Sequence, residues 1–233
     1  MFTILTVAAV AAVVAMLGGW AGYRLGTRRM ATLQTALDVA VRTATTDPLT
    51  GLANRSALTR RLAQLDRERR PFVLAIVNLD RFSTTNQWGY RIGDQLLVLQ
   101  AAQLRHAATQ RGGTVYRLVA DEFAVVWPAT AGVTVDAAAE LPAGVLAALR
   151  GSVELRIDSR AVYVHTSATA GVTVSEHLGT GDPTSRMLRN ADTALQHGKR
   201  TAPGTAVRWR PGLAALPRPR RDSRPGTPTA GVR

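Results

Sequence analysis

The sequence of 233 residues contains no cysteine, which excludes disulfide bonds and thiolate metal sites. Serine and histidine form no arrangement typical of a nucleophilic active site. Only one of the 29 basic residues, Lys199, is a lysine. The four histidines match no metal-binding spacing, and they are His106, His165, His177 and His197. Two adjacent acids, Asp121 and Glu122, are present between strand-like flanks, where acids at a turn can hold a metal ion.

Charge is also absent from Phe2 to Tyr23, a run long enough to span a bilayer as a helix. Trp20 and Tyr23 close this run, and such amphipathic rings suit a membrane interface. Arginines follow the run rather than precede it, which disfavours a cleaved signal peptide and predicts a cytoplasmic C-terminal side. We therefore expect a single-pass anchor over residues 1–23, with the rest of the chain on the cytoplasmic side of the cell membrane.

The net charge of +13 is concentrated near the two ends of the chain. Arginines crowd after the apolar run and in residues 211–233, whereas the middle of the chain mixes both signs. Residues 211–233 are rich in proline, arginine, glycine and threonine, which predicts a disordered tail. This tail could bind nucleic acid or anionic lipid, but the mixed middle makes nucleic acid an unfavoured partner.

Residues 24–45 are expected to form a juxtamembrane helical stalk. Its apolar residues recur at spacings of three and four, at Met30, Leu33, Leu37, Ala40 and Ala44. Such a stripe can pair two chains in parallel, or it can pack the helix against its own domain.

Residues 46–210 alternate helical and strand patterns and predict one α/β (α+β) domain. Thr46, before Asp47 and Pro48, favours a helix start. Helices are expected over residues 49–68, 92–110, 135–149 and 184–198, and strands over 72–79, 152–157, 162–174 and 206–209. Residues 116–127 predict a hairpin with Asp121 and Glu122 at its turn. These short connections indicate a central, mainly antiparallel sheet flanked by helices.

Four stretches resemble, in order and spacing, the motifs of GGDEF domains, the diguanylate cyclase family. They are "DPLTGLANR" (47–55), "NLDRFSTTNQWGYRIGDQLL" (78–97), "RLVADEF" (117–123) and "NADTALQHGK" (190–199). The resemblance covers about Thr46 to Trp209 and implies the palm-like fold of nucleotide cyclases. It also implies the condensation of two GTP molecules into cyclic di-GMP between two facing domains, with Mg²⁺ or Mn²⁺ as cofactor.

The resemblance assigns metal ligands to Asn78, to the backbone carbonyl of Leu79 and to Asp121, with Glu122 beside Asp121 as the second acid of the catalytic signature. Asn78 stands where the family has an aspartate, so that position keeps an oxygen but loses its charge. Asp80 matches a second family acid, with either a structural or a catalytic role.

The resemblance assigns nucleotide binding to Asn86, Asp94 and Lys199, with Val119 and Ala120 in place of the family's paired glycines. Asp94 has an alternative role as the cap of the following helix. The loop over residues 82–89 is one residue shorter than the family pattern. Anchoring that loop at Phe82 selects Asn86 as the guanine contact, whereas anchoring it at Gly89 selects Thr85.

Other family positions have also changed. Ser83 replaces a lysine and Pro203 a basic residue of the phosphate clamp, while Gln110 and Gly113 replace the product-inhibition pair. Arg117 matches the arginine of the family signature, or it is a solvated strand residue.

These departures predict a membrane-anchored GGDEF-domain signalling protein of the cyclic di-GMP pathway that is catalytically degenerate and acts by binding nucleotide or protein. The expected partners are GTP, a second copy, or another GGDEF or phosphodiesterase protein. The alternatives are an active diguanylate cyclase, and a binder of anionic surfaces or nucleic acid through its arginine-rich tail.

Overall fold

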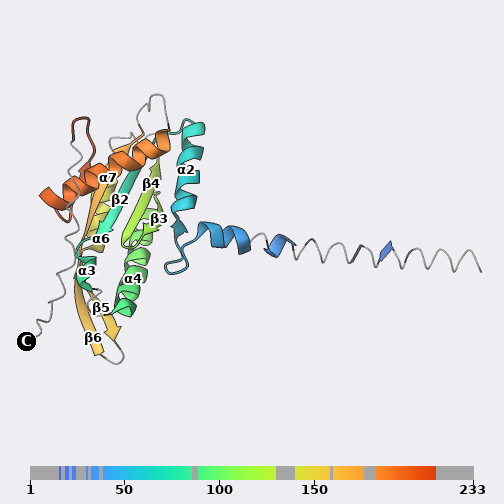
Figure 1. Ribbon diagram of the computed structural model, residues 1–233, viewed down its shortest axis with the longest axis horizontal. Helices are drawn as coiled ribbons and strands as arrows, with labels where there is room; N and C mark the ends of the chain where they lie inside the picture. The colour runs from blue at the N-terminus through green and yellow to red at the C-terminus, as the bar shows by residue number, and fades with distance from the viewer. Residues whose placement is uncertain are drawn as a thin grey trace, which may run out of the picture.

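In the described part of the chain, six strands form one mixed sheet with the order β1-β3-β4-β2-β7-β8 (Figure 1). The computed structural model describes residues 16, 19–20, 23–24, 30, 33–36, 39–85, 89–129, 140–157, 160–175 and 182–213. The strands are β1 (Ala53–Asn54), β2 (Phe72–Leu79), β3 (Thr114–Val119), β4 (Glu122–Pro128), β7 (Ala168–Val174) and β8 (Ala206–Arg208). The four inner strands pair antiparallel and the two edge strands pair parallel. The predicted α/β class with a mainly antiparallel central sheet is confirmed.

Helices cover both faces of this sheet (Figure 1). On one face α2 (Arg55–Arg67) and α7 (Pro183–Thr201) share an apolar core with the sheet. On the other face α4 (Tyr90–Thr109) and α6 (Leu141–Leu149) do the same. A separate hairpin of β5 (Gly151–Ile157) and β6 (Arg160–Thr166) packs against α4, and the short α3 (Phe82–Thr85) follows β2.

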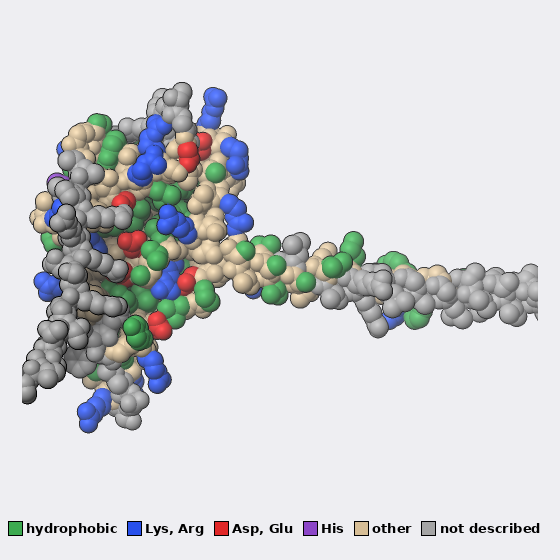
Figure 2. All heavy atoms as spheres, in the orientation of Figure 1, with side chains coloured by type: hydrophobic (Ala, Val, Ile, Leu, Met, Phe, Trp, Pro, Cys, Tyr) green, Lys and Arg blue, Asp and Glu red, His purple; other side chains and the backbone are tan. Residues whose placement is uncertain are grey.

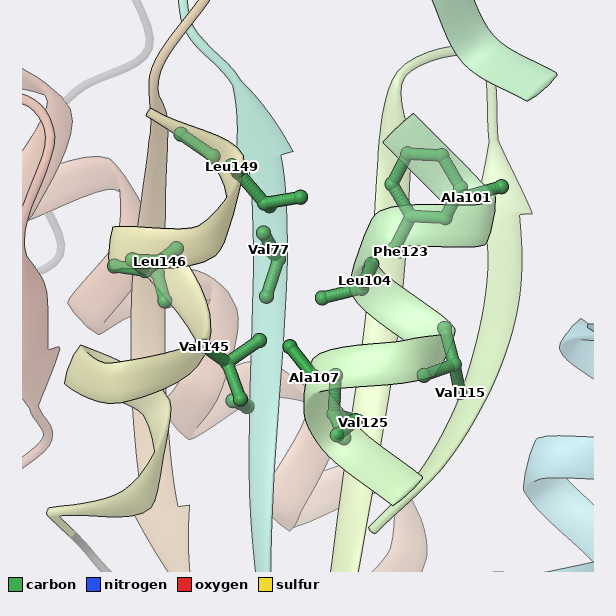
Figure 3. Packing of buried hydrophobic residues seen from close by; sticks show 14 of the residues in the cluster. Val77, Ala101, Leu104, Ala107, Val115, Phe123, Val125, Val145, Leu146 and Leu149 are labelled. Atoms are coloured by element: carbon green, nitrogen blue, oxygen red, sulfur yellow. The ribbon is translucent and has the colours of Figure 1, made fainter. Parts of the chain in front are cut away.

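The central strand β2 is buried along its whole length. Because side chains alternate between the faces of a sheet, Val73, Ala75 and Val77 pack toward α4 and α6, as Figure 3 shows for Val77. Leu74 and Ile76 pack toward α2 and α7. The next residue in this second series is residue 78, so the alternation itself directs Asn78 toward α7.

The helix expected over residues 49–68 begins later than predicted. The Asn54 side chain accepts a hydrogen bond from the Ala57 amide at 3.1 Å and caps α2, which therefore begins at Arg55. The strand expected over residues 162–174 is two strands, because the chain leaves β6 and enters β7 at Ser167. Of the helix expected over residues 135–149, the described part is α6.

The prediction of a single-pass membrane anchor, with its cell-membrane localisation, is wrong. None of the helices that the structure describes combines the length and the apolar character that crossing a bilayer requires. Of residues 1–23, only positions 16, 19, 20 and 23 lie among the described residues.

The predicted helical stalk and the predicted tail lie at the two ends of the chain, which the structure describes only in part. Residues 39–45 form a helix that leads away from the sheet, and the described apolar residues of the predicted stripe are exposed (Figure 1). Most of the predicted tail, residues 214–233, lies outside the described part. On the domain, basic side chains are spread over several elements of the visible face, with acidic ones between them (Figure 2).

Candidate functional site

The candidate site lies where the carboxyl end of β2 meets the β3–β4 turn. Asn78 pairs with Glu122 across the β2–β4 ladder, so both side chains lie on the face that α7 covers. Asn78 is only 4% exposed, whereas Glu122 is partly exposed. The backbone amide of Leu79 donates a hydrogen bond to the Asp121 carbonyl at 3.2 Å. The structure thus brings together all of the predicted metal-ligating positions.

Lys199 completes this cluster from the last turn of α7. Its Nζ donates a hydrogen bond to Oδ1 of Asn78. The charge of Lys199 also acts on Asp121 and Glu122. The predicted phosphate-binding lysine therefore lies at the metal-ligand position, 121 residues away along the chain.

The turn of the predicted hairpin consists of Ala120 and Asp121, while Glu122 is already the first residue of β4. Ala120 has a φ of 49°, which is the left-handed region that favours glycine. Val119 is 55% exposed. The residues in the place of the paired glycines therefore lie at the surface of the turn, and one of them has a strained backbone.

Burial raises the pKa of Asp121, although hydrogen bonding from Asn78 and the charge of Lys199 act in the opposite direction. Burial also raises the pKa of Glu122, and the nearby charges of Asp121 and Asp192 raise it further. The two adjacent carboxylates thus repel one another in a partly desolvated place. The charge of Lys199 acts on both and offsets this repulsion, and the charge of Arg117 acts on Asp121 as well.

Arg117 holds the turn to the beginning of the domain. Its Nη1 lies 2.9 Å from Oδ1 of Asp47, while Nη2 and Nε donate to the Ala120 carbonyl at 2.9 and 3.2 Å. Asp47 also accepts hydrogen bonds from the amide and hydroxyl of Thr50 at 2.8 and 2.6 Å. The interpretation of Arg117 as a solvated strand residue is wrong, because its side chain is 10% exposed and ion-paired.

Asp80 has a structural position. Its carboxylate accepts hydrogen bonds from the hydroxyls of Ser167 at 2.8 Å and Thr169 at 2.7 Å. These bonds tie the loop after β2 to β7 and use both carboxylate oxygens.

The predicted guanine contacts are not joined to this cluster in the described residues. Asp94 is exposed in α4, and it cannot cap that helix because α4 begins four residues earlier at Tyr90. Asn86 lies outside the described residues. A cavity of about 310 Å³ between α3 and β6 is lined by Asp80 and Phe82 but not by Asn78.

The cluster does not fit a resident divalent ion. Asn78 contributes no charge, and its oxygen already accepts a hydrogen bond from an ammonium group. Within the residues that the structure describes, no three His, Asp or Glu side chains lie close enough to hold a metal ion. Mg²⁺ prefers anionic oxygen ligands, and a second cation at the same oxygen would repel it.

The sequence prediction missed the Asp47–Arg117 pair. Asp47 belongs to the motif at residues 47–55 and Arg117 to the motif at residues 117–123. The resemblance of both motifs to one family was the available sign that the two residues could lie close together. Nothing in the local pattern indicates that the two motifs touch, since they are 70 residues apart.

Comparison with known proteins gives a consistent result. Residues 44–204 match the family model described as diguanylate cyclase, GGDEF domain. The diguanylate cyclase DgcP of Pseudomonas aeruginosa is 32% identical over 162 residues, which cover 67% of this chain and 23% of DgcP. The chain spans between 19% and 23% of the length of the curated relatives it matches.

Solved structures share the fold. A DgcB fragment from Caulobacter crescentus, with its coiled coil and GGDEF domain, superposes with a TM-score of 0.67 at 24% identity, covering 78% of this chain and 95% of that one. The diguanylate cyclase SiaD of Pseudomonas aeruginosa, solved in complex with its activator SiaC, gives a TM-score of 0.61 at 26% identity, covering 79% and 69%.

Proposed function

The chain belongs to the GGDEF, or diguanylate cyclase, family, and from this premise we propose that it is a cyclic di-GMP signalling protein with a degenerate catalytic site. It acts by binding GTP or another protein rather than by turning GTP over. Any Mg²⁺ or Mn²⁺ at the site is expected to arrive with the triphosphate, because protein carboxylates and substrate phosphates commonly share such an ion.

The observation that carries this proposal is the hydrogen bond between Lys199 and Asn78. An amide replaces the acidic ligand that the family resemblance requires, and a protein cation is bound to its oxygen. Loss of a charged metal ligand removes several kcal/mol of transition-state stabilisation, or about a thousandfold or more in rate. The strained turn at Ala120, where the family has glycine, supports the same conclusion.

An active cyclase is the second candidate, and one observation favours it. Asp121, Glu122 and Lys199 remain in one cluster beside the end of β2. These are the acids and the lysine that the family resemblance assigns to the site.

A dimer is the proposed assembly, formed through the apolar stripe on residues 30–44, part of which lies in the helix over residues 39–45. The side chains of Met30 and Leu33 are 64% and 65% exposed, so they are free of the domain core. The Asn54 side chain donates a hydrogen bond to the Ala44 carbonyl at 3.0 Å and ties the end of this helix to the start of α2. A second copy or a related GGDEF or phosphodiesterase protein would cover the exposed stripe.

Chromatography of nucleotide products tests the proposal. The purified full chain is incubated with GTP and Mg²⁺ or Mn²⁺, and cyclic di-GMP and pyrophosphate are quantified beside an Asp121→Ala variant. We expect no product from a chain that is folded by circular dichroism. GTP binding is measured in parallel by isothermal titration calorimetry.

Product formed by the natural chain and lost in the variant would identify an active cyclase. If neither product formation nor GTP binding is detected, the role reduces to protein binding, and the partner is sought by pull-down with purified GGDEF and phosphodiesterase proteins.

A further inference from the structure

We propose that the ammonium of Lys199 is the resident cation of this site, where it replaces a divalent ion and makes the cluster stable without metal. The inference rests on the proposed binding role, because an active cyclase would have to move this lysine to admit its metal. It concerns three groups that face the same place, namely the amide of Asn78 and the carboxylates of Asp121 and Glu122.

The first argument is charge. Asp121 and Glu122 are adjacent, partly buried carboxylates that repel one another. The ammonium of Lys199, which is hydrogen-bonded to Asn78 beside them, is a positive charge that acts on both carboxylates. A divalent ion would perform the same task in a site with three carboxylates.

The second argument is the chemistry of residue 78. An amide has an acceptor end and a donor end. Oδ1 of Asn78 accepts a hydrogen bond from Lys199, while the Asn78 side chain also hydrogen-bonds to the carboxylates of Asp121 and Glu122. An aspartate in this position could accept from the lysine but could not donate to the carboxylates. The amide therefore links the lysine to the two carboxylates, which an aspartate could not do.

The third argument is that packing fixes the backbone from which the Lys199 side chain extends. Gly198, the preceding residue, is buried, and a β-carbon there would lie 2.9 Å from Cγ2 of Val207 and 3.0 Å from Cγ2 of Thr169. The last turn of α7 is therefore pressed against β7 and β8. The backbone at Lys199 is therefore held in place, and from it the ammonium reaches Oδ1 of Asn78.

Binding of a divalent ion without nucleotide then requires the displacement of Lys199. Two cations cannot share the Asn78 oxygen without strong repulsion, since like charges about 4 Å apart repel strongly near a protein surface. Removing the lysine should open the site to metal. Restoring an acid at residue 78 should make the stability of the fold depend more strongly on a bound metal ion.

Thermal unfolding of the full chain with and without Mn²⁺ tests the proposal, with Kd values from isothermal titration calorimetry. The variants are Lys199→Met and Asn78→Asp, and Arg200→Met is the control for loss of a positive charge in the same helical turn. We expect both site variants to lose stability in metal-free buffer and to recover it in Mn²⁺. Mn²⁺ should bind both at least about tenfold more tightly than it binds the natural chain or the control.

An equal rise in Tm with Mn²⁺ for the natural chain and for Lys199→Met would overturn the proposal. So would equal gains in Mn²⁺ affinity for Lys199→Met and Arg200→Met, because these would reflect net charge alone. If Asn78→Asp fails to fold even with Mn²⁺, the Lys199→Met comparison decides. These readouts need no turnover, so formation of cyclic di-GMP would refute the proposed function separately.

Discussion

Nη1 of Arg117 lies 2.9 Å from Oδ1 of Asp47, and the same guanidinium holds the carbonyl of Ala120. This arginine therefore joins the first turn of the domain to the turn that carries the acids. The ion pair is mostly buried, with side-chain exposures of 10% for Arg117 and 19% for Asp47.

We predict that Arg117→Ala destabilises the fold by about 2–3 kcal/mol, because it leaves Asp47 without its charge partner and the Ala120 carbonyl without its donors. Arg117→Lys should recover only part of the loss, since an ammonium cannot reproduce the forked contacts of a guanidinium. Urea unfolding measures both. Arg60→Ala, at an exposed position of α2, should change stability by less than about 0.5 kcal/mol. Equal effects at the two arginines would contradict this role.

The same pair predicts a pH dependence. Burial alone would raise the pKa of Asp47, but hydrogen bonds from Thr50 and Arg117 outweigh it and lower the pKa. The folded state therefore binds this proton less readily than the unfolded chain. The resulting stability is present above the unfolded pKa of about 3.9 and is lost as the pH falls through the folded value.

Asp47→Asn should thus be less stable than the natural chain at neutral pH, and the difference should shrink steadily below about pH 5. Urea unfolding at a series of pH values measures this convergence. A difference that stays constant down to about pH 3 would show that the ionisation of Asp47 does not contribute.

The left-handed backbone at Ala120 predicts a stabilising substitution. Ala120→Gly should increase the free energy of unfolding by about 1 kcal/mol, because glycine adopts a φ of 49° without steric cost. The same exchange at Ala147, an exposed position inside α6, should instead destabilise by about 1 kcal/mol. Thermal and urea unfolding compare the two, and effects of the same sign would refute the assignment of strain.

The sequence was sufficient to predict elements with a strong local pattern. The eight buried residues of β2 were recognised as a strand. Asp121 was correctly placed in a turn, but Glu122, predicted beside it, is the first residue of β4. Prediction from the sequence was less reliable where a polar side chain forms a hydrogen bond with a distant part of the chain. Ser167 ends one strand and donates to Asp80, yet serine within a β-branched run gives no sign of a break.

The contacts that define the site could not be predicted, because they join distant parts of the chain. The membership of Asn78 and Lys199 in one site followed from family resemblance, but their direct hydrogen bond depends on how closely α7 packs on the sheet. That packing depends in turn on a glycine in β7 whose role no local pattern reveals.

Gly171 is this glycine, and it allows α7 to lie directly on the sheet. A β-carbon at residue 171 would overlap the backbone carbonyl of Ala191 and the amide of Leu195. Gly171→Ala should therefore destabilise by more than about 3 kcal/mol or prevent folding, because backbone atoms cannot move aside cheaply.

Gly144→Ala is the matched control. It lies inside α6, where the nearest atom to a new β-carbon is Nε of the flexible Arg111 side chain at 3.3 Å. Alanine should stabilise this helix by about 0.5–1 kcal/mol. Circular dichroism and thermal unfolding measure both variants. A Gly171→Ala chain as stable as Gly144→Ala would show that α7 does not need this close approach.

The exposed stripe before the domain predicts how two copies associate. Leu33→Glu should convert a dimer of the full chain into monomers, because a charge replaces an apolar contact at the spacing of a parallel helix pair. Gln34→Glu introduces the same charge one position away, off the stripe, and should leave the dimer intact. Light scattering after size-exclusion chromatography gives the mass of each. If Leu33→Glu remains dimeric, the contact lies elsewhere, and the helix over residues 39–45 serves only to lead into the domain.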